Sequence, residues 1–121
     1  MADPLLVAIV EPHPEMHTAI ASVLGGAADV RIVEHARSLP ELWSAEPDAV
    51  DVLVADLRAC VGQPAALARL RERYPGLRLL VTTTDHGTEY RDAVERLAAD
   101  GLVSKTELAD VLLSALRRLT P

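Results

Sequence analysis

Four polar side chains with complementary chemistry lie where short apolar runs of the sequence end: Glu11, Asp56, Thr83 and Lys105. A carboxylate such as that of Asp56 can act as a nucleophile and accept a phosphoryl group. A second acid, Glu11, can help to hold a hard cation such as Mg²⁺, which prefers oxygen ligands. A hydroxyl and an ammonium beside the acceptor could each bond to one phosphoryl oxygen. Brought together, these side chains would form a phosphoryl-acceptor site.

The apolar runs that precede these side chains have the pattern of buried strands. They are short, rich in β-branched residues and apolar at both alternations, which is typical of strands covered on both faces of a parallel sheet. The predicted strands are Leu5–Val10, 30–33, 50–56, 77–82 and 101–104.

Between the strands, amphipathic segments predict helices after Pro14, Ser38, Pro64, Thr88 and Thr106. Ser38 and the glutamate three residues later form a capping box, and Thr106 is expected to cap the last helix, whereas 58–63 is interpreted as a loop. The order is therefore β–α repeated five times. It predicts an α/β fold with a five-stranded, doubly wound parallel sheet and right-handed crossovers. The strands' carboxyl ends, where such sheets bind ligands, would meet at one edge.

Composition narrows the class of protein. The chain has 121 residues, 50% of them hydrophobic, which predicts a single domain over 1–121. A net charge of −6 argues against direct nucleic-acid binding. The single cysteine, Cys60, excludes an intrachain disulfide. No apolar run approaches membrane-spanning length, so we expect a cytoplasmic protein that does not contact a membrane.

The chain resembles the receiver domains of two-component response regulators over essentially its full length. The resemblance rests on four stretches in order: 7–11, 51–58, 74–83 and 100–105. Glu11 and Asp56 lie 45 residues apart, and Thr83 and Lys105 lie 22 apart, as the family implies.

The resemblance implies a flavodoxin-like fold and a role for each residue of the edge. Asp56 would be the phospho-acceptor, Thr83 the switch hydroxyl and Lys105 the phosphate-binding lysine. Mg²⁺ would be held by Glu11, Asp56 and the backbone carbonyl of Arg58. Such a domain is not an enzyme beyond accepting a phosphoryl group and dephosphorylating itself. Implied partners are a histidine kinase or another signalling protein, a second copy in a homodimer and, if the sequence is a fragment, a DNA-binding output domain.

Three positions depart from the family pattern. Pro12 stands where the family carries the second acid, its principal direct Mg²⁺ ligand, and proline has no side-chain oxygen. Cys60 replaces a usual proline, and Leu102 replaces the aromatic switch residue. These departures predict an atypical receiver whose Mg²⁺-dependent phosphorylation is weakened or lost.

The residues leave simpler interpretations open. Asp56 is also a suitable turn cap, and either Glu11 or Asp56 is a suitable ion-pair partner for Lys105. The threonines at 82 and 84 compete with Thr83. Cys60 is expected to be a packed apolar group whose pKa nearby acids raise. His13 and His86, with the two acids, form a conceivable Zn²⁺ site.

Two other functions compete with phosphoryl acceptance. The first is a non-phosphorylated pseudo-receiver that acts as an interaction or dimerisation module. The second is a small α/β ligand or nucleotide binder. The second is disfavoured because 11–14 has two prolines and no glycine, so it offers few free N–H groups to a phosphate.

Overall fold

The computed structural model describes residues 3–84 and 88–119. Its sheet has five strands in the order β2-β1-β3-β4-β5, and every neighbouring pair is parallel. The strands are β1 (Leu5–Val10), β2 (Val30–Ala36), β3 (Val52–Asp56), β4 (Arg78–Thr83) and β5 (Gly101–Ser104). The predicted five-stranded parallel α/β fold is confirmed.

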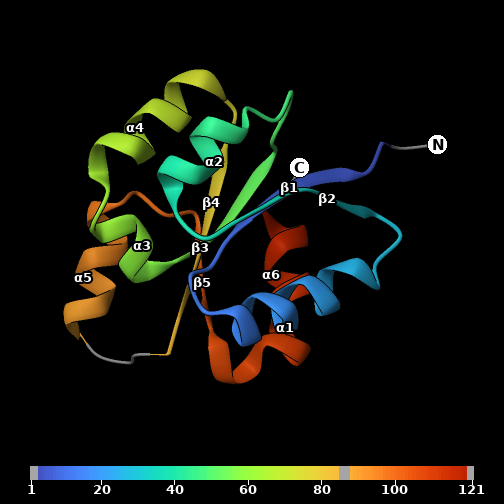
Figure 1. Cartoon of the computed structure of the whole chain (residues 1–121). Coiled ribbons are helices and arrows are strands. Elements are labelled where there is room, and N and C mark those ends of the chain that lie inside the picture. Colours follow the sequence, from blue (N-terminus) through green and yellow to red (C-terminus); the bar gives the residue numbers. More distant parts are fainter. Residues whose placement is uncertain (1–2, 85–87, 120–121) are drawn as a thin grey trace.

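Helices cover both faces of the sheet (Figure 1). They are α1 (Pro14–Gly25), α2 (Leu39–Ala45), α3 (Leu57–Val61), α4 (Pro64–Arg73), α5 (Thr88–Arg96) and α6 (Leu108–Arg118), with a short 3₁₀ helix η1 (Lys105–Glu107). The helices α1 and α6 pack on one face, and α2 to α5 lie on the other. No helix among the described residues is long and apolar enough to cross a membrane.

The central strands β1 and β3 are buried on both faces, which explains why apolar and polar residues do not alternate in their sequences. All five residues of β3 are buried, as are the last four of β1. Leu53 and Ala55 pack towards α2 to α4, whereas Val52 and Val54 pack towards α1 and α6. A strand covered on both faces must be apolar at both alternations, which is the pattern that predicted it.

Three local predictions were wrong. The segment 58–63, predicted as a loop, contains most of α3, because the Asp56 side chain accepts a hydrogen bond from Ala59 N (3.1 Å) and caps this short helix. The second strand runs on to Ala36, since an edge strand tolerates polar residues on its open side. The cap before the last helix is Ser104, whose Oγ accepts from Thr106 N and starts η1.

Other boundaries agree with the local chemistry. Ser38 Oγ accepts a hydrogen bond from Glu41 N (3.2 Å), so the predicted cap of α2 is confirmed. Tyr74, at the end of α4, is buried, and its hydroxyl donates to the carbonyl oxygen of Pro47. These contacts fix the start of α2 and the end of α4, two helices on the same face of the sheet.

Candidate functional site

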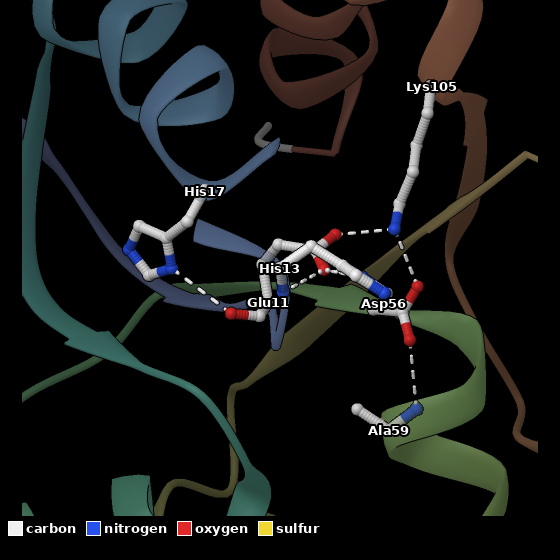
Figure 2. Close-up of polar contacts among 6 residues, drawn as sticks. All are labelled: Glu11, His13, His17, Asp56, Ala59 and Lys105. Carbon is white, nitrogen blue, oxygen red and sulfur yellow. Dashed lines mark hydrogen bonds and ion pairs between the residues drawn. The ribbon is translucent and has the colours of Figure 1, made fainter. Parts of the chain in front are cut away.

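The sheet places Glu11, Asp56 and Lys105 at its carboxyl edge (Figure 2). Glu11 follows β1, Asp56 ends β3 and Lys105 follows β5. Beside them is a hollow of about 380 Å³. Its lining includes His13, Met16, Asp56, Leu57, Arg58, Thr83, Thr84 and Lys105. Spacing along the chain therefore predicted correctly which side chains meet.

Lys105 lies between the two acids and contacts both. Its Nζ is 2.5 Å from Glu11 Oε1 and 2.7 Å from Asp56 Oδ1. The side chains are 5%, 0% and 9% exposed for Lys105, Glu11 and Asp56, so water screens these contacts little. We call these three residues the carboxylate–lysine cluster. Its formal charge is −1 when all three groups are ionised.

The pKa of Lys105 reflects two opposing effects. Burial lowers it, because an ammonium is less well solvated inside the protein, but hydrogen bonds and charge attraction from Asp56 and Glu11 outweigh burial. The net direction is upward from the ordinary value of 10.5. Lys105 is therefore a cation at neutral pH, fixed between two carboxylates.

The second oxygen of Glu11 is also engaged. Its Oε2 accepts a hydrogen bond from His13 N (3.0 Å) and lies 3.1 Å from His13 Nδ1. The histidine side chain is 76% exposed, at the mouth of the hollow. Glu11 thus both pairs with Lys105 and holds the turn that leads into α1.

Asp56 both caps a helix and pairs with Lys105. Its Oδ1 accepts from Lys105 Nζ, and its Oδ2 accepts from Ala59 N at the start of α3. Each of the four carboxylate oxygens of Glu11 and Asp56 therefore faces a donor or cation of the chain itself. A turn cap and an edge carboxylate are here the same side chain.

The three threonines at the end of β4 differ in position. Thr83 and Thr84 line the hollow, and the Thr83 side chain is nearly buried. Thr82 is fully buried, and its Oγ1 has no hydrogen-bond partner among the described residues. Placement beside the hollow therefore favours Thr83 over Thr82 as the switch hydroxyl, which stays a prediction.

The oxygen donors expected of a Mg²⁺ site are incomplete. Pro12 is exposed and supplies no side-chain oxygen. Within the described ranges, no group of three or more His, Cys, Asp or Glu side chains is placed to hold a metal ion. The roles of Glu11, Asp56 and the Arg58 carbonyl as Mg²⁺ ligands stay predictions. His86, half of the conceivable Zn²⁺ pair, lies outside the described residues.

The two remaining departures from the receiver pattern have different surroundings. Leu102, where an aromatic switch residue was expected, is 41% exposed on β5. Cys60 is fully buried in α3 among the residues between α2 and α4. Burial raises its pKa to about 12, and the charge of Asp56 adds to the effect.

The Cys60 thiol is therefore expected to be inert in the folded protein. Only the thiolate is the nucleophile, and burial both suppresses it and blocks access. When a coloured disulfide reagent is added at pH 8, the thiol of the native chain should react hardly at all. In denaturant, one equivalent of thiol per chain should react. Rapid labelling without denaturant, at the rate of a small-molecule thiol, would show that α3 opens and that this assignment is wrong.

One contact near the edge was missed from the sequence. His17 on α1 and His35 on β2 lie side by side, with ring nitrogens 2.9 Å apart. Both residues lie in segments whose apolar periodicity located the elements, but periodicity does not report which polar side chains of two elements touch. A pair of histidines 18 residues apart carried no other signal.

Comparison with solved structures finds receiver domains. The isolated receiver domain of RcsB from Salmonella enterica serovar Typhimurium is 25% identical, with a TM-score of 0.82 over 95% of this chain and 86% of that one. The non-phosphorylated receiver domain of Escherichia coli RcsB is 25% identical, with a TM-score of 0.80 over 97% and 93%. The receiver domain of the putative response regulator NarL from Mycobacterium tuberculosis is 19% identical, with a TM-score of 0.70 over 96% and 98%.

The fold and the site thus define a class: the chain has the fold of response-regulator receiver domains. These neighbours support its interpretation as a receiver domain of a two-component response regulator. The chain spans 64% of the length of a longer RcsB chain from Salmonella typhimurium. No protein-family model and no curated protein sequence matches it.

Proposed function

We propose that this chain is an atypical receiver domain that signals by binding a protein partner, without Mg²⁺-dependent phosphorylation. The observation that carries the proposal is Pro12, which supplies no side-chain oxygen beside two acids that already lie 2.5 and 2.7 Å from Lys105 Nζ. A cation attached to the chain already offsets the charge that Mg²⁺ would otherwise offset. The domain is then not an enzyme and works in the cytoplasm with another signalling protein or a second copy of itself.

Competition for the oxygens supports this proposal. Mg²⁺ demands near-octahedral oxygen coordination and gives up its waters reluctantly. At Glu11 and Asp56 it would compete with Lys105 Nζ, and Oε2 of Glu11 is held by two contacts from His13. Pro12, at the position of the expected second acid, has no side-chain oxygen that could bind Mg²⁺.

A second function, phosphoryl acceptance by Asp56, is favoured by the hollow beside the cluster. Its volume of about 380 Å³ and the presence of Thr83 and Lys105 in its lining suit a phosphoryl group. In that reaction an Asp56 oxygen would form a bond to phosphorus of an acyl phosphate. The bond from phosphorus to the leaving carboxylate would break, and the electron pair would depart with the carboxylate.

One experiment separates the two functions. The chain is incubated with acetyl phosphate, with and without Mg²⁺, and its intact mass is measured beside that of the P12D variant, which restores an acid. We expect no adduct on the wild type and a Mg²⁺-dependent adduct on P12D. The matched control is P12D/D56N, which lacks the acceptor and should stay unmodified.

Three outcomes would contradict the proposal or its explanation through Mg²⁺. A Mg²⁺-dependent adduct on the wild type, lost in D56N, would overturn the partner-binding proposal in favour of phosphoryl acceptance. Absence of an adduct from P12D as well would show that residue 12 does not control the chemistry, and would overturn the explanation through Mg²⁺. A change in oligomeric state of the wild type on addition of Mg²⁺ and acetyl phosphate would also contradict the proposal.

A further inference from the structure

A second groove, of about 280 Å³, adjoins Glu11. Its lining also includes His17, His35, Arg37 and Glu41. Glu11 belongs to the carboxylate–lysine cluster, whereas the other four residues do not. The two histidines are thus a candidate site next to the cluster.

The two histidines in this groove converge. His17 Nε2 and His35 Nδ1 are 2.9 Å apart, and the ring centroids are 5.1 Å apart. His17 is half-buried on a helix of 12 residues, and His35 is exposed on a strand of seven. Both rings are therefore anchored to regular elements.

A backbone carbonyl orients the inner ring (Figure 2). His17 Nδ1 lies 3.3 Å from the carbonyl oxygen of Glu11, so Nδ1 carries the proton and donates it. The lone pair of His17 then lies on Nε2, facing His35. A histidine that donates one N–H to a backbone carbonyl and presents its other nitrogen is the usual arrangement of a metal ligand.

The ligand type favours particular metals. His17 Nε2 and His35 Nδ1 are 2.9 Å apart, the length of a hydrogen bond between the rings, so both rings must turn for their nitrogens to face one ion. Two imidazole nitrogens with water in the remaining positions suit tetragonal Cu²⁺ or Ni²⁺, and Cu²⁺ has the higher affinity for imidazole.

We infer that His17 and His35 form a two-histidine binding site for Cu²⁺, and less tightly for Ni²⁺. In the described part of the chain no third His, Cys, Asp or Glu side chain completes a protein-only site, so water fills the remaining positions. Arg37 and Glu41 also line the groove. On binding, the proton of His35 moves from Nδ1 to the solvent-facing Nε2, so that both lone pairs reach the metal.

The test is a Cu²⁺ titration of the untagged chain in a non-coordinating buffer, followed by calorimetry and by electron paramagnetic resonance. We expect one site whose spectrum shows coupling to two imidazole nitrogens. H17Q and H35Q should each lower the affinity by at least about tenfold. The matched control is H13Q, which removes an exposed histidine outside the groove and should bind as the wild type does.

Three results would overturn the inference: no binding, coupling to a single nitrogen, or equal binding by the wild type and both groove variants. Loss of binding in H13Q would assign the metal to the mouth of the hollow instead. Circular dichroism of each variant confirms that the fold is kept, since the substituted side chains are outside the buried core. Ni²⁺ gives an independent comparison and should bind at the same two histidines.

Discussion

Replacing Lys105 with methionine is expected to lower the free energy of unfolding by about 3–5 kcal/mol at pH 7, the usual cost of removing one partner of a buried ion pair. The variant keeps the long side chain but leaves Glu11, which is 0% exposed, and Asp56 without their shared cation. The loss comes mainly from the two uncompensated carboxylates rather than from the contacts of the lysine itself.

The effect of this substitution depends on pH in a defined direction. In the wild type, the pKa of Lys105 is raised on folding, so its contribution is complete below the ordinary 10.5 and is lost as pH rises through the raised value. At alkaline pH the free energy of unfolding of the wild type should therefore fall as Lys105 loses its proton. K105M has no lysine at this position and should not show this fall.

Urea unfolding from pH 7 to 11 measures both parts of this prediction. The control is E11Q/K105M, in which the remaining acid has no like-charged neighbour, and it should recover part of the loss. Equal stability of K105M and the wild type at pH 7 would show that the cluster is solvated and that Lys105 does not neutralise the acids.

The sheet could be predicted from the sequence because burial on both faces leaves a strong pattern. Val52 to Ala55 must be apolar to lie between two helical layers, and the prediction of β3 rests on that requirement. The helix α3 could not be found in this way, because five residues are too few to show a period. It depends on a single side-chain cap from Asp56.

At the site, the chain positions predicted the meeting of Glu11, Asp56 and Lys105 but not the choice of partners. Parallel topology brings the ends of β1 and β3 together as neighbours, with the end of β5 two strands from β3. A four-carbon stem lets Lys105 reach both acids, so the two ion pairs that the sequence offered as alternatives form at once. Side-chain reach of this kind has no periodic signal in a sequence.

The second large effect is expected at Asp56, where alanine and asparagine should differ. D56A removes both the cap of α3 and one partner of Lys105, and we expect a loss of about 2–4 kcal/mol from a cap and a charged hydrogen bond together. D56N keeps an oxygen that can accept from Ala59 N, and asparagine caps helices about as well as aspartate does. It should therefore be milder than D56A by about 1 kcal/mol.

Hydrogen exchange of the Ala59 amide separates the two roles of Asp56. In the wild type this N–H donates to Oδ2 of Asp56. D56A should speed its exchange, and D56N should leave it close to the wild-type rate while still losing the charge opposite Lys105. If both variants exchange alike and lose equal stability, the cap contributes nothing and the role of Asp56 lies entirely in its charge. If D56N alone keeps the amide protected, the same carboxylate both starts α3 and faces Lys105, and any chemistry at Asp56 would be transmitted directly to that helix.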